Sequence, residues 1–102
     1  MASKTLVKDG PRTVEVDGIS VGVAVDPADD YELAECSTVI YDPASTPAER
    51  SRAIVRQNRL VLGDAHDRVM AELRGRNGGR LPVSAVTAFV NEVIKAVDEL
   101  KN

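Results

Sequence analysis

The sequence predicts an α+β fold: a single small domain in which an N-terminal β-hairpin precedes about four α-helices. β-branched runs flank Asp17-Gly18, and this pattern predicts a hairpin because a type I′ turn needs positive φ at both central residues. Apolar residues recur at alternating steps of four and three through residues 82–100, as in an amphipathic helix. The length of 102 residues fits one domain. We expect residues 1–11 to be a tail or irregular segment and residues 12–102 to form the domain.

The hairpin is expected over residues 13–25. A two-residue loop pairs Val16 with Ile19 and Val14 with Val21, which places all four side chains on one face. Two strands alone are marginally stable in water, so the helices must cover that apolar face.

The first helix is expected over about residues 27–41. Asp26 is suited to cap it, and Pro27 is suited to the first helical position. Its apolar side is formed by Leu33, Cys36 and Ile40.

The second helix is expected over about residues 47–62. Thr46, Pro47 and Glu49 form the pattern of a capping box with proline at the first position. One arc of this helix is apolar and holds Ile54, Val55, Val61 and Leu62. Another arc, on the far side, holds Arg52, Arg56 and Arg59.

The third helix is expected over about residues 64–74, with Asp64 as its cap and Gly75 in the loop that follows. Its core candidates are Val69, Met70 and Leu73.

The last helix is expected over residues 82–100. Its apolar stripe comprises Val86, Phe89, Val90, Val93, Ile94, Val97 and Leu100. We expect this stripe to be internal core, because so small a domain has few other large apolar faces.

Composition excludes several protein classes. A lone cysteine cannot form an internal disulfide, so a disulfide-stapled secreted module is excluded. The N-terminal residues have no apolar h-region, so no signal peptide is expected. No apolar run reaches the roughly 20 residues that a membrane-spanning helix needs. We therefore expect a soluble protein of a reducing cytoplasm that has no membrane partner.

Charge is segregated along the chain although the net charge is only −3. Residues 26–49 contain seven acidic residues and no Lys or Arg, whereas residues 50–80 contain eight arginines. The two segments either pair with each other or leave an arginine face for a partner. Candidate partner-binding residues are Arg52, Arg56 and Arg59. A nucleic-acid partner is disfavoured because the chain is acidic overall and has few aromatic residues for stacking bases.

Side chains that carry chemistry are few. Cys36 lies on the apolar side of its predicted helix, where a buried inert thiol is expected. His66 lies in the first turn of a helix and is expected to be an exposed surface histidine. The acidic group of Asp26, Asp29 and Asp30 lacks the spacing of a calcium loop and is better explained by capping. We therefore expect no catalytic residue, no metal site and no cofactor, and a function other than that of an enzyme.

The order of these motifs resembles the small tail assembly chaperones of long-tailed bacteriophages and prophages. The resemblance covers about Thr13 to Leu100. It rests on the Asp-Gly hairpin and on three short motifs: Asp29-Asp30-Tyr31-Glu32-Leu33, Leu62-Gly63-Asp64, and Pro82-Val83-Ser84-Ala85-Val86 leading into Phe89. Tyr31 matches the aromatic residue that often follows the acidic pair in that family. Ala65 and His66 stand where a bulky or aromatic residue is common.

This resemblance implies a non-enzymatic function in the cytoplasm of a bacterial host. Such proteins coat the long, helical, apolar tape-measure protein before the tail tube polymerises around it. The partner is then a tape-measure or other tail protein, and self-association is a further option. Two alternatives stay open: a small nucleic-acid-binding regulator that uses the arginine-lined helix, and a generic protein-interaction module that uses the last helix.

Overall fold

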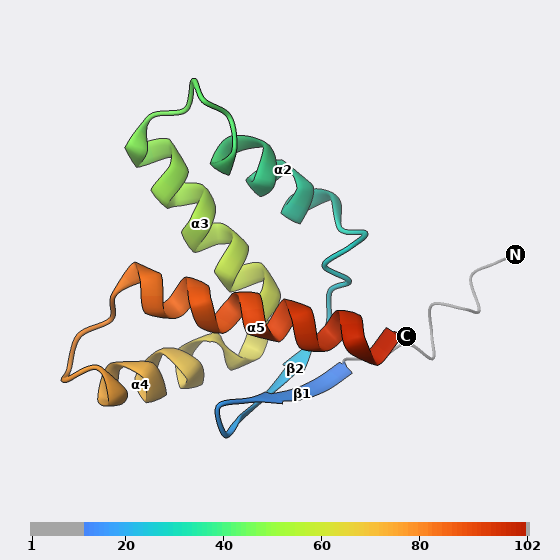
Figure 1. Cartoon of the computed structure of the whole chain (residues 1–102), viewed down its shortest axis with the longest axis vertical. Helices are drawn as coiled ribbons and strands as arrows, with labels where there is room; N and C mark the ends of the chain where they lie inside the picture. The colour runs from blue at the N-terminus through green and yellow to red at the C-terminus, as the bar shows by residue number, and fades with distance from the viewer. Residues whose placement is uncertain (1–11, 102) are drawn as a thin grey trace, which may run out of the picture.

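A two-stranded antiparallel sheet precedes a series of helices, and the α+β class is thereby confirmed (Figure 1). The computed structural model describes residues 12–101, so the predicted segment 1–11 lies outside the described residues. The strands are β1 (Arg12–Val16) and β2 (Ile19–Val23). The helices are α2 (Tyr31–Ile40), α3 (Pro47–Leu62), α4 (His66–Arg76) and α5 (Val83–Lys101), with a 3₁₀ turn, η1 (Gly63–Ala65), between α3 and α4.

The hairpin turn has the backbone geometry that its sequence predicts. Asp17 and Gly18 both have positive φ, 52° and 80°. The register pairs the expected residues: Val14 with Val21 and Val16 with Ile19. All four side chains are buried, because helices cover this face of the hairpin.

Helix α5 lies against β1, and both contribute buried side chains to the hydrophobic core (Figure 1). The buried side chains of α5 are Val86, Phe89, Val90, Val93 and Val97. This arrangement confirms that the stripe is internal, with one correction. Leu100 is 58% exposed, because it lies in the last turn of α5, where fewer described elements surround the helix.

The start of α2 differs from the sequence prediction. Asp30, not Asp26, is the N-cap, and its Oδ1 accepts a hydrogen bond from the backbone N–H of Leu33 at 3.0 Å. Asp26 instead closes a turn, with its Oδ1 accepting from the Ala28 N–H at 3.1 Å. Aspartate before proline starts turns as readily as helices, and here the side chain that caps α2 is that of Asp30.

Helix α3 has the predicted bounds and a complete capping box between Thr46 and Glu49. Helix α4 begins two residues later than predicted. Asp64 lies within η1 and does not cap α4, whose N-cap Ala65 makes no side-chain capping bond. Gly75 lies inside α4 and not in the loop. The chain enters α4 through a continuous 3₁₀ turn, so this helix start needs no separate cap.

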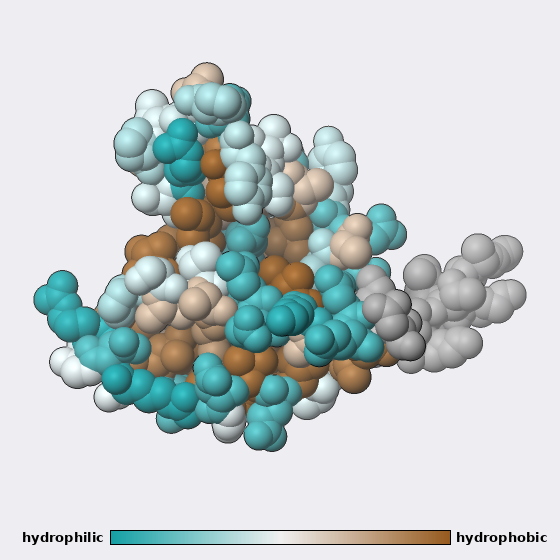
Figure 2. All heavy atoms as spheres, viewed as in Figure 1, coloured by the Kyte–Doolittle hydropathy of each residue, from teal (hydrophilic) through white to brown (hydrophobic). Residues whose placement is uncertain are grey.

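The pair of α2 and α3 projects from a body formed by the hairpin, α4 and α5 (Figure 1). The lower half of α3 joins that body, and its upper half faces α2. Figure 2 shows hydrophobic side chains gathered in the angle between the projecting pair and α5. On the face shown, apolar side chains therefore gather where the two parts of the fold meet.

Candidate protein-binding groove

A small apolar groove lies where α3, the start of α4 and the start of α5 come together. Its volume is about 100 Å³. The groove is lined by seven residues: Val55, Asn58, His66, Met70, Leu81, Val83 and Val86. Three elements that are separated in the sequence thus supply one binding surface.

Two valines from different helices remain half-exposed at this groove. Val55 of α3 is 48% exposed and Val83, the first residue of α5, is 55% exposed. The sequence grouped Val55 with Val61 and Leu62 on one apolar arc of α3, but in the structure those two are buried and Val55 is not. Of this helix, Val61 and Leu62 belong to the hydrophobic core, and Ala53 and Asn58 are also buried. Val55 therefore retains apolar surface that another molecule could cover.

Asn58 lies in the groove with an unused hydrogen-bonding group. The residue is only 4% exposed, and its Oδ1 has no hydrogen-bond partner among the described residues. Nearly all buried polar atoms in proteins have a partner, so a buried amide of this kind calls for an explanation.

His66 also lines the groove, and it is not the exposed histidine that the sequence predicted. Its side chain is 15% exposed, because the α3–α4 turn places it against α3 and the start of α5. The Nδ1 atom lies 2.9 Å from Oδ1 of Asp67, which points into solvent. This hydrogen bond lowers the pKa of the Asp67 carboxyl below its ordinary value.

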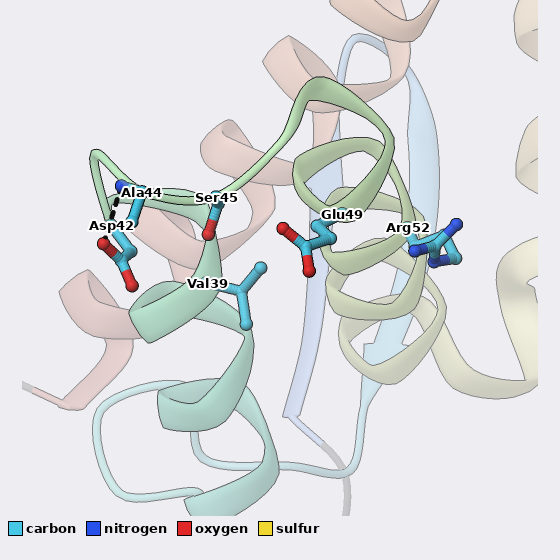
Figure 3. A pocket seen from close by; sticks show the side chains of 6 residues that line it. All are labelled: Val39, Asp42, Ala44, Ser45, Glu49 and Arg52. Carbon is cyan, nitrogen blue, oxygen red and sulfur yellow. Dashed lines mark hydrogen bonds between the residues drawn. The ribbon is translucent and has the colours of Figure 1, made fainter.

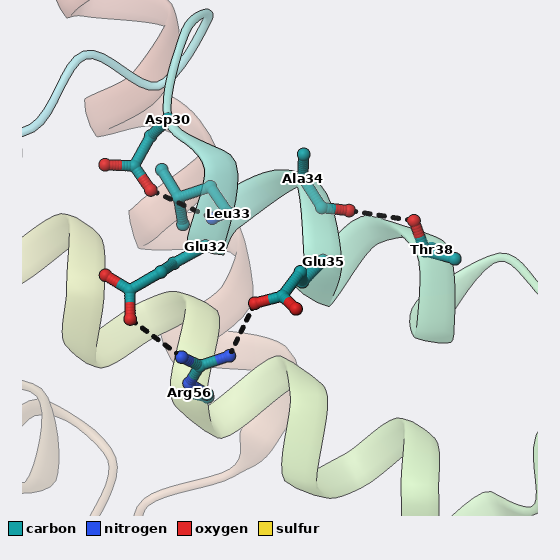
Figure 4. Close-up of polar contacts among 7 residues, drawn as sticks. All are labelled: Asp30, Glu32, Leu33, Ala34, Glu35, Thr38 and Arg56. Carbon is teal, nitrogen blue, oxygen red and sulfur yellow. Dashed lines mark hydrogen bonds and ion pairs between the residues drawn. The ribbon is translucent and has the colours of Figure 1, made fainter.

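The three candidate arginines are all exposed, but only one of them forms ion pairs with described residues. Arg56 binds α2: its Nη2 lies 2.9 Å from Oε2 of Glu32, and its Nη1 lies 3.8 Å from Oε1 of Glu35 (Figure 4). The acidic and basic segments of the sequence therefore do meet, at this bridge. Among the described residues, Arg52 and Arg59 form no ion pair.

Arg52 and Arg59 lie on either side of Val55 along α3, three residues before it and four after it. Residues at these spacings share one helix face, so this face carries a valine between two arginines. Figure 3 shows that the Arg52 side chain points away from the Glu49 carboxylate. Neither arginine lines the groove itself, but both lie within one helical turn of Val55, which does.

A larger cavity beside the α2–α3 loop has a different character. It is lined by Val39, Asp42, Ala44, Ser45, Glu49 and Arg52 (Figure 3). Its polar groups hold the loop together: Oδ1 of Asp42 accepts from the Ala44 N–H at 2.9 Å, and Glu49 closes the capping box. These contacts are structural, so the cavity is a weaker candidate for a binding site than the groove.

Other chemistry-bearing groups do not assemble in the described part of the chain. Cys36 is buried in α2, as predicted. Within residues 12–101, no three His, Cys, Asp or Glu side chains are placed to hold a metal ion. None of the helices described is both long and apolar enough to cross a membrane.

Comparisons with protein-family models, curated proteins and solved structures found no match.

Sequence reasoning identified Arg52 and Arg59 but missed the apolar residues of the groove. Asn58 carried a usable signal, because an amide one turn before Leu62 interrupts the apolar arc of α3. No sequence pattern indicated that Leu81 and Val83 line a groove, because their neighbours depend on how α5 packs against α3.

Proposed function

We propose that this chain is a non-enzymatic binding protein whose groove takes the apolar face of a helical segment of another protein. The observation that carries the proposal is the pair Val55 and Val83, which leave apolar surface exposed on two helices around one cavity. Grooves between helices bind amphipathic helices by taking up their apolar side chains. The small groove suits a narrow ridge of aliphatic residues.

Within this class we propose a tail-assembly-chaperone-like role in the cytoplasm of a bacterial host. The partner is then the tape-measure protein, whose long helical segments carry apolar ridges. Covering such ridges before assembly prevents them from aggregating, and this task needs binding surface but no reactive group. The sequence motifs around Asp30, Gly63 and Val83 support this assignment through the resemblance described above.

The alternative, a nucleic-acid-binding regulator, requires Arg52, Arg56 and Arg59 to act as one face toward phosphates. Arg56 is paired with two carboxylates of α2, whose negative charges offset its attraction for a phosphate. The protein partner is therefore the better supported of the two.

A direct binding measurement tests the groove. Fluorescently labelled helical peptides cut from a tape-measure protein are titrated with the full chain and with its Val83→Asp variant. An acidic residue at the first position of α5 is favourable to the helix, so the variant should fold while losing apolar surface at the groove. We expect the affinity to fall by about tenfold or more.

Leu100→Asp is the matched control, because Leu100 is equally exposed but lies at the other end of α5. This variant should bind as the parent does. Equal losses in both variants, or no binding by the parent chain, would overturn the proposal.

The gene neighbourhood tests the assignment to phage tails separately. A very long tape-measure gene nearby and an overlapping downstream reading frame are expected. A neighbourhood of unrelated metabolic genes would contradict the tail assignment while leaving helix binding to the peptide experiment.

A further inference from the structure

We infer that the helix bound by the groove carries acidic side chains on both sides of its apolar ridge, and that Arg52 and Arg59 bind them. This inference rests on the proposed function and adds the chemistry of the partner. It assigns recognition to two arginines and leaves the third outside the interface.

The first step is the placement of these two side chains. Arg52, Val55 and Arg59 share one face of α3, and Val55 lines the groove. Arg52 and Arg59 are seven residues apart, so their backbones are separated by about 10 Å along the helix axis. A helix lying along α3 with its ridge on Val55 would meet both arginines about two turns apart.

The second step is that the guanidinium groups of Arg52 and Arg59 are available. Neither forms an ion pair with a described residue. The carboxylates of Glu49 and Asp67, on which Arg52 and Arg59 act through space, have other partners: Oε1 of Glu49 accepts from the Thr46 N–H at 2.7 Å, and Asp67 is bonded to His66. These carboxylates attract the arginines through space but leave their N–H donors unused.

The third step is the difference between these arginines and Arg56. Arg56 lies on the side of α3 that faces α2, where Glu32 and Glu35 already bind it (Figure 4). It is therefore a structural residue of the α2–α3 pair. The chain thus contains its own control, because the same kind of residue on the same helix has a different role.

The chemistry of arginine indicates what the partner carries. A guanidinium group binds a carboxylate with two parallel hydrogen bonds, and such pairs gain strength when binding removes water from the margin of an interface. Opposite charges also accelerate association, and added salt reduces this effect. The partner should therefore be an amphipathic helix with aliphatic residues at its centre and glutamate or aspartate at each end of the contact.

Three synthetic helical peptides test the inference. All share one leucine ridge. The first has two glutamates that flank the ridge at the spacing of Arg52 and Arg59, the second has lysines at those positions, and the third has the two glutamates on the opposite face. We expect the first to bind at least about tenfold more tightly than the second at low salt, with the third between them.

Variants then connect the preference to the arginines. The double variant Arg52→Gln/Arg59→Gln should bind the glutamate and lysine peptides within about threefold of each other, and the association rate should lose most of its salt dependence. Arg56→Gln should keep the preference of the parent chain.

The outcomes separate the two proposals. If the double variant keeps the parent's preference, or if Arg56→Gln removes it, the inference is wrong although the groove still binds helices. If Val83→Asp leaves the affinity for all three peptides unchanged, or if the parent chain binds none of them, the groove is not a helix-binding site and both proposals fail.

Discussion

Thr46 and Glu49 bind each other's backbone at the start of α3. The Thr46 N–H donates to Oε1 of Glu49 at 2.7 Å, and the Glu49 N–H donates to Oγ1 of Thr46 at 3.1 Å. The two bonds satisfy groups that a helix N-terminus leaves without partners. They set the position at which the helix that carries Arg52, Val55 and Arg59 begins.

Thr46→Ala should lower the free energy of unfolding by about 1 kcal/mol, because it removes the side-chain acceptor of the capping box. Urea unfolding followed by circular dichroism measures this change. Thr38→Ala is the control: Thr38 lies inside α2, where its hydroxyl donates back to the Ala34 carbonyl, and alanine favours a helix interior. Equal destabilisation by both variants would contradict the capping role.

The pKa of the Asp67 carboxyl should lie below its ordinary value, because the His66 ring is hydrogen-bonded to it. A lowered folded-state pKa adds stability above the carboxyl's ordinary pKa, and this contribution is lost as the pH falls through the lowered value. An NMR titration of the side-chain carboxyl carbon tests this in the parent chain and in His66→Gln.

In His66→Gln the pKa of Asp67 should return toward its ordinary value. The pKa of Glu49, which is lowered chiefly by its bond to the Thr46 backbone, should not move and serves as the internal control. An unchanged pKa of Asp67 in this variant would show that another group is responsible.

Val93→Asp should unfold the protein, because Val93 is completely buried in the core between α5 and the hairpin. An unpaired carboxylate there should cost roughly 4 kcal/mol or more, a large fraction of the stability of a small domain. Thermal melting followed by circular dichroism measures the loss. Leu100→Asp, on the same helix, should change stability by no more than about 0.5 kcal/mol. A Val93→Asp variant that melts like the parent would refute the core assignment.

Asn58→Leu should raise the free energy of unfolding by about 1 kcal/mol, because it replaces a buried amide oxygen that has no partner with an apolar group of similar size. Chemical denaturation measures the gain. Asn91→Leu, at an exposed position of α5, should have little effect. Destabilisation by Asn58→Leu would mean that the amide has a structural partner in solution.

Features that depend on a few neighbouring residues were predictable from the sequence. The Asp17-Gly18 turn sets the hairpin register by itself, because the two-residue loop leaves one favourable pairing of the flanking valines. The Thr46 capping box sets the start of α3 in the same local way. The periodic stripe of α5 predicted its buried face, since an apolar face that long must be covered.

The start of α2 was less predictable, because two aspartates offered caps of similar chemistry. Asp26 and Asp30 lie one turn apart, and each is followed by residues that tolerate a helix. The observed cap at Asp30 gives a helix that buries Leu33 and Cys36. Tertiary packing therefore decided which of the two aspartates caps α2, because their local sequences favour a cap almost equally.

The sequence by itself determined the hairpin and its register, the bounds of α3 and the buried face of α5, because turns, caps and periodicity act over about four residues. Tertiary structure alone decided that Val55 is exposed, that the His66 side chain is mostly buried, and that Arg56 binds α2 through carboxylates while Arg52 and Arg59 form no such pair with a described residue. The physical reason is that burial and pairing depend on which helix faces meet. The groove joins α3, α4 and α5, so no local pattern contains it.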